Sequence, residues 1–436
     1  MTARYLAVQA LMRQERDGYS NLVLDAELKR CQPPLSARDA AFATRIFYTV
    51  LERQNLLDDI LARFSRRPLA KLDPPVRAIL RAGLAQASYM EVPLPAAVNE
   101  SVKLTRAFGK SSASGMVNAM LRRAAACRVG PEEYPDSLRR LCIYYSLSEP
   151  VARLLLDQYG HEALDLAAAF YDRHPTAVRV NTLRTSATAL TERLQAEGAE
   201  VAPSPWDNCL LVGFPGGVAS SKAFEEGLFH VQGLASQYAA LCVEAKPGMR
   251  VLDLCAAPGG KSLTMAQQME DTGTLLCGEG VKSRVPLLEK AFARCGVHCA
   301  QPFFGDAAVF DPEKGFFDRV LCDVPCSGLG VIGKKPDIRY KSLDAVEKIY
   351  DLQQKILENG ARYLAQNGRL VYSTCTVNRL ENEEQIRKFL DRNPGFAVRV
   401  PETLPQGAEA GNCGTLFLPH KTGTDGFFVA ILERKR

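Results

Sequence analysis

The C-terminal part of the chain alternates short apolar runs with helical segments, and this alternation restricts the possible folds more than any other feature. Apolar runs suited to strands occur at residues 250–254, 274–278, 319–323 and 369–373, and helical patterns lie between them, as at 261–270 and 344–365. Repetition of strand, turn and helix is typical of a parallel sheet with helices on both faces. We therefore predict a doubly wound, Rossmann-like α/β domain over residues 246–436.

The remaining residues of the 436-residue chain predict two further domains. Helical periodicity runs through residues 38–64, 74–90, 94–108 and 113–127, with prolines in the breaks, which predicts an all-α bundle over residues 1–130. Residues 131–245 begin with a helix that starts at Ser148 and ends at Gly160, and then mix strand patterns, such as 177–183, with a helix. This mixture predicts linker helices and a small α+β domain.

Charge is distributed unevenly along the chain. Residues 1–130 carry 20 Lys and Arg against 11 Asp and Glu, whereas the rest of the chain is slightly acidic. The densest basic stretches of the helical part are Arg63, Arg66, Arg67 and Lys71, followed by Arg122, Arg123 and Arg128. A basic module joined to a nearly neutral one favours an anionic partner, so we expect these residues to contact nucleic-acid phosphates.

Composition excludes several classes of protein. The 13 cysteines are odd in number and scattered, which favours a reducing cytoplasm over a disulfide framework. The N-terminal segment carries charge throughout, and no apolar run approaches the length of a membrane span. Neither the cysteines nor the five histidines show zinc-ligand spacing. We therefore expect a cytoplasmic monomer that uses no metal and does not bind membranes.

A nucleotide-binding type of turn follows the first strand of the α/β part. LDLCAAPGGKS, residues 252–262, runs from a buried strand through small residues into a helix, which lets a ligand approach the backbone. The turn lacks GxGxxG, which argues against a nicotinamide dehydrogenase, and it is not a Walker loop because the first glycine of that motif is missing. Glu279 ends the next strand, where an acid can hold ribose hydroxyls, and Asp306 follows the next apolar segment, where a carboxylate can contact an adenine amino group.

Two cysteines lie just past neighbouring apolar strands. Cys326 belongs to VLCDVPCSG and Cys375 to LVYSTCT. Ligands bind at strand ends in open parallel sheets, so two thiols directed into one crevice indicate covalent chemistry beside the nucleotide. A basic-aromatic segment with Lys334, Lys335 and Arg339 follows Cys326, and we expect it to clamp phosphates beside a flipped base.

Five motifs together resemble those of the Sun/Fmu-type RNA cytosine-5 methyltransferases, and the resemblance covers essentially the whole chain. The motifs are LDLCAAPGGK, DVPCSGLG, KKPDIRY, YSTCTVNRLENE and DGFF. The helical front end is similar to the antitermination factor NusB, which directs the resemblance to members that act on small-subunit (16S) ribosomal RNA. It implies transfer of a methyl group from S-adenosylmethionine to carbon 5 of a cytosine. Transfer RNA as the substrate, and a ribosome assembly factor that has lost catalysis, are the alternatives.

The resemblance also implies roles for individual residues. The cofactor loop would comprise Cys255, Ala256, Ala257, Pro258, Gly259, Gly260 and Lys261, with Glu279 at the ribose, Arg284 at a matching family position, Asp306 at the adenine, and Asp323 between the methionine end and the target base. The chain departs from the family at Glu279 and Val324, where aspartate and alanine are usual, and at Gly233, where aspartate is frequent.

The resemblance assigns the two thiols different tasks. Cys375 would add to carbon 6 of the cytosine, Cys326 would assist release of the methylated base, and Asp323 would hydrogen-bond or protonate the ring nitrogen. DNA cytosine-5 methyltransferases instead use the cysteine of a Pro-Cys pair, which here is Cys326. Arg179, in the tripeptide RVN, resembles a residue of an RNA-contacting strand in the family.

Overall fold

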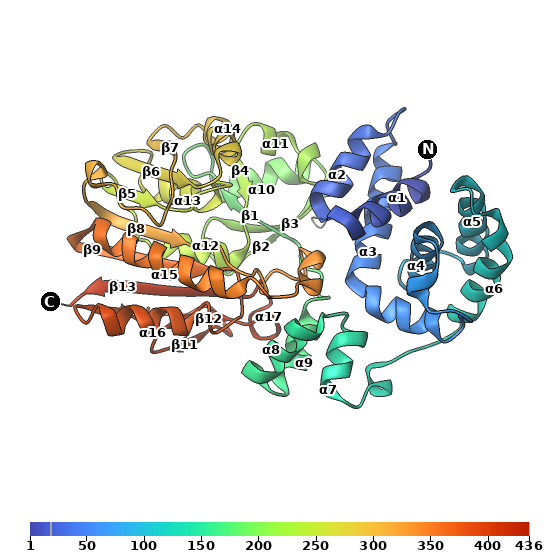
Figure 1. The fold of residues 1–436 in the computed structure, drawn as a ribbon. Coiled ribbons are helices and arrows are strands. Elements are labelled where there is room, and N and C mark those ends of the chain that lie inside the picture. The colour runs from blue at the N-terminus through green and yellow to red at the C-terminus, as the bar shows by residue number, and fades with distance from the viewer. Residues whose placement is uncertain (18–19, 436) are drawn as a thin grey trace. The chain divides into compact units, whose positions relative to one another are not determined.

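The computed structural model describes residues 1–17 and 20–435, and the chain forms two compact units (Figure 1). The first unit contains Met1–Ala168 together with Lys334–Leu343, and the second contains Ala169–Gly333 and Asp344–Arg436. Lys334–Leu343, called the crossing segment below, therefore belongs to the N-terminal unit although both of its flanks belong to the other. Among the described residues, no helix has both the length and the apolar character needed to span a membrane.

The first unit is built from helices, as predicted. Its main helices are α1 (Ala3–Asp17), α2 (Ser20–Arg30), α3 (Ala37–Ala62), α4 (Pro74–Tyr89), α5 (Leu94–Ala107), α6 (Ser114–Ala124) and α8 (Glu149–Tyr159), and α9 (Glu162–Ala169) follows at its end. Ser36 begins α3 because its side chain accepts a hydrogen bond from the Asp39 amide. Leu6, Phe47 and Ile79, from three different helices, are fully buried in one shared core. This apolar core is what the helical periodicity encodes.

The crossing segment is anchored in the first unit by backbone and side-chain contacts. Its short helix η8 (Pro336–Tyr340) carries Arg339, which is fully buried and donates to the Tyr145 carbonyl at 2.9 Å. The Tyr340 hydroxyl donates to the Leu51 carbonyl at 2.5 Å. Ser148 Oγ donates to the Lys341 carbonyl at 2.6 Å. Ten residues of a distant part of the sequence thus complete the packing of the helical unit.

The second unit begins with the small α+β domain. In the described chain, its four strands are β1 (Thr176–Val180), β2 (Glu200–Pro203), β3 (Cys209–Gly213) and β4 (Phe229–Val231), and they form an antiparallel sheet in the order β2-β3-β1-β4. The helix α10 (Ala187–Ala196) packs on it, because Leu190 and Leu194 share a core with Val178 and Phe229. The small α+β domain is therefore confirmed.

The rest of the second unit contains a nine-stranded sheet among the described residues. Its parallel strands are β5 (Arg250–Asp253), β6 (Thr274–Glu279), β7 (Ala300–Phe304), β8 (Phe317–Asp323) and β9 (Leu364–Thr374), and its antiparallel strands are β10 (Phe396–Arg399), β11 (Glu409–Gly411), β12 (Gly414–Phe417) and β13 (Phe427–Arg434). Helices α13 (Gly260–Gln268), α14 (Val285–Cys295), α15 (Val346–Tyr363) and α16 (Glu383–Arg392) lie between strands in the sequence (Figure 1). The Rossmann-like domain is confirmed.

The order of the parallel strands fixes where a ligand can bind. The strands run β9-β8-β5-β6-β7, so the chain moves outward from β5 through β6 and β7 and then returns to the other side of β5 with β8. Connections leave the carboxyl ends of β5 and β8 in opposite directions, which opens a crevice at this switch point. Asp253 and Asp323 are the last residues of these two strands.

Candidate active site

The predicted cofactor loop lies at the carboxyl ends of β5 and β6. The Ala256 amide donates to the Gly278 carbonyl at 2.8 Å, which fixes the loop to the neighbouring strand. Gly259 begins α13 with φ of +106°, and an added Cβ there would meet Leu288 at 3.3 Å. Glycine is required at this position because an L side chain would be strained and crowded. The loop therefore leaves backbone groups and a helix N-terminus beside the crevice.

Two acids follow the next strands in the order the sequence predicts. Glu279 ends β6, is 4% exposed, and accepts a hydrogen bond from the Val281 amide at 2.8 Å. Arg284 forms an ion pair with Glu279 at 3.3 Å and donates to the Ala257 carbonyl at 2.8 Å, so it joins the acid to the cofactor loop. Asp306 follows β7, is exposed, and accepts from the Ala308 amide at 2.9 Å. The structure thus places the loop and both acids on adjacent strand ends.

Asp253 lies beneath the loop and was not among the predicted site residues. It is 1% exposed and accepts a hydrogen bond from Ser262 Oγ at 2.7 Å. Burial, opposed by the hydrogen bond from Ser262 and assisted by the nearby charge of Asp323, raises the pKa of Asp253 to about 7.

Asp323 is held between the cofactor loop and β9. Lys261 Nζ donates to Asp323 Oδ2 at 2.7 Å, and Ser373 Oγ donates to Asp323 Oδ1 at 2.7 Å. Lys261 also lies 5.1 Å from the centre of the Phe427 ring. Both oxygens of the Asp323 carboxylate therefore have fixed partners. Sequence reasoning missed Ser373; the signal available for it was its place at the end of an apolar run, two residues before Cys375.

The two cysteines meet because their strands are paired. Asp323 on β8 is in register with Ser373 on β9, so the loops that follow bring Cys326 and Cys375 together. Their Sγ atoms lie 3.2 Å apart, in contact but well beyond the length of about 2.05 Å of a disulfide bond. The hydrogen bond with Cys375 and burial raise the pKa of Cys326 well above its ordinary value. Cys326 consequently remains a thiol and can donate to the sulfur of Cys375.

The predicted RNA-binding residues differ in accessibility. Lys334 and Lys335 are exposed at the start of the crossing segment. Arg339 is 0% exposed in the helical unit, and Arg179 is 5% exposed with its guanidinium donating to the Asp207 carbonyl at 2.8 Å. The RNA contacts of Arg339 and Arg179 stay predictions, and in this structure neither buried guanidinium presents an exposed surface to a phosphate. Sequence spacing placed Arg339 beside Cys326 but could not show that its segment packs in the other unit.

The two basic stretches of the helical unit converge on one pocket. This pocket of about 450 Å³ is lined by Phe64, Ser65, Arg66, Arg67, Leu72, Met116, Ala119, Met120 and Arg123. The Arg123 guanidinium lies 4.9 Å from the centre of the Phe64 ring. Arg63 is paired instead with Asp59 and Glu133, at 2.8 and 2.9 Å. The pocket combines three arginines with an apolar floor, a combination suited to a nucleotide.

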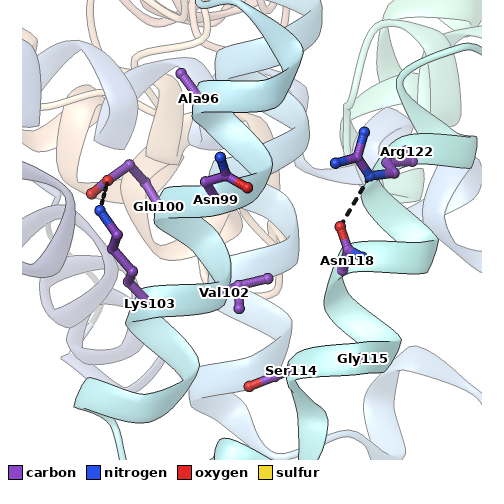
Figure 2. Close-up of a pocket in the computed structure, with 9 residues that line it drawn as sticks. All are labelled: Ala96, Asn99, Glu100, Val102, Lys103, Ser114, Gly115, Asn118 and Arg122. Atoms are coloured by element: carbon purple, nitrogen blue, oxygen red, sulfur yellow. Dashed lines mark hydrogen bonds and ion pairs between the residues drawn. The ribbon is translucent and has the colours of Figure 1, made fainter.

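A second groove of the helical unit is polar. It lies between α5 and α6, has a volume of about 630 Å³, and includes Asn99, Lys103, Asn118 and Arg122 in its lining (Figure 2). Lys103 is paired with Glu100 at 2.7 Å, and Arg122 donates to Asn118 at 3.0 Å. These cations are engaged within their own helices, so the apolar pocket with Arg66, Arg67 and Arg123 is the better candidate for RNA.

Comparison with known proteins assigns the family. Residues 240–433 match the model described as 16S rRNA methyltransferase RsmB/F, residues 1–126 match the NusB family, and residues 151–218 match the ferredoxin-like domain of RsmF/B-like methyltransferases. A relative from Synechocystis, named probable ribosomal RNA small subunit methyltransferase B, is 33% identical over 100% of both chains. The chain belongs to the RsmB/F methyltransferase family.

Other RsmB/F relatives and solved structures agree. A Bacillus subtilis protein with the same name is 33% identical over 100% of this chain and 99% of its own. A Xylella fastidiosa protein named ribosomal RNA small subunit methyltransferase B is 32% identical over 94% of this chain and 96% of its own. The crystal structure titled PH0851 superposes with a TM-score of 0.82 at 28% identity, covering 100% of this chain and 99% of that one. The three-part architecture is thus the one these proteins share.

Proposed function

We propose that this RsmB/F protein transfers a methyl group from S-adenosylmethionine to carbon 5 of a cytosine in small-subunit ribosomal RNA. The observation that carries the proposal is the contact of the two thiols at 3.2 Å. The loop that carries Cys326 directly follows Asp323, whose carboxylate accepts a hydrogen bond from Lys261 of the predicted cofactor loop. The RNA substrate is supported by the names of relatives that match this chain over 94–100% of its length.

The residues at the switch point fit S-adenosylmethionine. Cys255–Lys261 supplies a tight turn at a helix N-terminus, Glu279 is a buried acid for the ribose hydroxyls, and Asp306 offers an exposed carboxylate to the adenine edge. Arg284 orients Glu279 through their ion pair. When bound, the cofactor supplies an electrophilic methyl group on a sulfonium.

The resemblance to the Sun/Fmu-type enzymes, together with the raised pKa of Cys326, favours Cys375 as the nucleophile. A Cys326 thiol that retains its proton can donate a hydrogen bond across the 3.2 Å contact, which would favour the charged form of Cys375. The Cys375 sulfur would add to carbon 6 of cytosine, which makes carbon 5 nucleophilic towards the methyl group that the bound cofactor would supply. After transfer, a general base would take the carbon 5 proton, the 5,6 double bond would re-form, and the Cys375 sulfur would leave and take a proton from Cys326.

Alanine variants of the two cysteines test this assignment. Cys375→Ala should abolish both methyl transfer and the covalent protein–RNA adduct, whereas Cys326→Ala should accumulate the adduct. The measurements are tritium transfer from labelled S-adenosylmethionine to 16S RNA and a denaturing gel for the adduct. Cys413→Ala, a half-buried cysteine outside the pair, is the matched control. The reverse pattern would assign the nucleophile to Cys326, and methylation of transfer RNA alone would contradict the proposed substrate.

A further inference from the structure

Glu381 is a carboxylate with no solvent exposure that lies between the two cysteine loops. Its Oε1 accepts hydrogen bonds from Ser327 Oγ at 2.5 Å and from Asn378 Nδ2 at 3.0 Å, with Thr376 Oγ1 at 3.4 Å. Its Oε2 accepts from the Ser327 amide at 2.7 Å and from Gln353 Nε2 at 3.1 Å. All of these donors are uncharged.

This arrangement is unusual for a group that serves packing alone. Burying an ionised carboxylate is costly unless hydrogen bonds replace its hydration, and both oxygens of Glu381 receive such bonds. An apolar residue of similar volume would fill the same space without that cost. The groups that the Glu381 carboxylate binds are therefore the reason to expect a role for it beyond packing.

The groups held by Glu381 are the immediate neighbours of the two thiols. Ser327 follows Cys326, Thr376 follows Cys375, and the hydroxyls of Ser327 and Thr376 are themselves 2.8 Å apart. Gln353 uses the same amide nitrogen that contacts Glu381 to donate to the Pro325 carbonyl at 2.9 Å, on the other side of Cys326. One carboxylate thus joins the loop after β8 to the loop after β9.

We propose that Glu381 is a positioning residue for methyl transfer, which holds the Cys326 thiol in contact with Cys375 by binding Ser327 and Thr376. The inference rests on the proposed cysteine mechanism and names the group that sets its geometry. Glu381 acts through the residues beside the thiols rather than by touching the substrate.

The charge of Glu381 gives this role a signature that simple packing lacks. It adds to the rise in the pKa of Cys326, after the hydrogen bond with Cys375 and burial. Other ionisable groups near the pair and Glu381 are Asp323 with its partner Lys261, and two tyrosines. The hydroxyl of the buried Tyr372 donates to the Glu381 carbonyl at 2.7 Å, and the Tyr350 hydroxyl accepts from Asn378 Nδ2 at 3.0 Å. Removing the Glu381 charge should therefore make the thiol pair ionise at lower pH.

Glu381→Gln in the full chain tests the role. The variant keeps the size of the side chain but directs an amide N–H group at a donor, so Ser327 shifts and the thiols separate. We expect adduct formation with 16S RNA to slow about 100-fold, the cost of a misplacement of about 1 Å, while KM for S-adenosylmethionine stays unchanged. The pH midpoint for alkylation of the thiol pair by iodoacetamide should move to lower pH. Glu384→Gln, a partly exposed carboxylate of α16, is the matched control and should leave both readouts unchanged.

Ser327→Ala alone provides a second route if Glu381→Gln folds poorly, because it removes the hydroxyl link to Glu381, keeps the amide link, and should by itself slow adduct formation. If Glu381 acts through Ser327, Glu381→Gln should slow adduct formation less in the Ser327→Ala background than in the wild type. Fully additive effects, or a wild-type adduct rate and alkylation profile in Glu381→Gln, would overturn the inference. Absence of any adduct in Cys326→Ala would instead overturn the cysteine mechanism itself, so the two failures are distinguishable.

Discussion

Burial of the Asp253 side chain beneath the predicted cofactor loop makes the folding stability of the protein depend on pH. The pKa of Asp253 is raised to about 7 by burial, above the value of 3.8 for an unperturbed aspartate. The folded protein therefore holds this proton more tightly than the unfolded chain does. The stabilisation is fully present below about pH 4 and is lost as the pH rises from about 4 to about 7.

We predict that Asp253→Asn abolishes the loss of folding stability that accompanies ionisation of Asp253 as the pH rises. At about pH 8 the variant should unfold at a higher temperature than the wild type, by a difference in the free energy of unfolding on the order of 3 kcal/mol, and the difference should shrink towards about pH 5. Thermal unfolding followed by circular dichroism across this pH range measures it. Asp391→Asn, at an exposed position of α16, should show no such pH dependence. A constant difference between Asp253→Asn and wild type at all pH values would contradict the shift.

For single residues, the sequence shows which chemistry a side chain can perform more readily than it shows which groups surround that side chain in the fold. Cys326 and Cys375 were identified because each follows an apolar run, and paired strands then bring them together. Glu381 could not be identified, because its role depends on Ser327, which is 54 residues away in the chain and is brought close only by folding. The burial of Arg339 could not be predicted for the same reason, because it depends on residues almost 200 positions earlier.

At the scale of elements, regular apolar patterns predicted four of the parallel strands, and the exceptions have physical causes. The β7 strand, AQPFF, contains a proline and has no buried residue, so it lacks the apolar run of a central strand. It lies at the edge of the sheet, where these features are tolerated. The antiparallel β13 is largely buried, but nothing in its apolar run indicates its direction relative to β9.

The pocket formed by the α3–α4 connection and α6 supports a prediction about RNA binding. Arg66→Glu combined with Arg123→Glu should weaken binding of 16S RNA and reduce the slope of log K against log salt by about 1.4, at about 0.7 for each lost contact with a single strand. Filter binding at several salt concentrations measures the slope. Lys388→Glu, at an exposed position of α16, changes charge by the same amount per site and serves as the control. An unchanged slope in the double variant would show that these arginines do not contact phosphates.

At the scale of the whole molecule, the helical unit includes a segment that lies far from the rest of it in the sequence. The helical unit extends to Ala168 and includes Lys334–Leu343. The domain limits at residues 130 and 245 stay predictions about which parts fold independently. Composition could not indicate the crossing segment, because Lys334, Lys335 and Lys341 are typical of a solvated loop. Its apolar residues, Pro336 and Ile338, are nevertheless buried.

The crossing segment should therefore stabilise the helical unit even when it is detached from its flanks. We expect a fragment of residues 1–168 to unfold at a lower temperature than the same fragment with residues 334–343 appended through a Gly/Ser linker. Burial of Ile338 alone contributes about 2 kcal/mol, and about 2–4 °C in Tm accompanies each kcal/mol in a unit of this size. The appended segment should accordingly raise Tm by about 5 °C in calorimetry.

Arg339→Ala in the appended segment distinguishes specific docking from a general effect of added residues. The buried guanidinium donates to the Tyr145 carbonyl, and its loss leaves that carbonyl without this donor and opens a cavity. The variant should lose most of the gain in Tm, whereas Lys335→Ala, at an exposed position, should retain it. If both variants match the fragment without the segment, the ten residues do not dock on their own. Their place in the helical unit would then depend on the flanking chain, which runs from Cys326 on one side to Cys375 on the other.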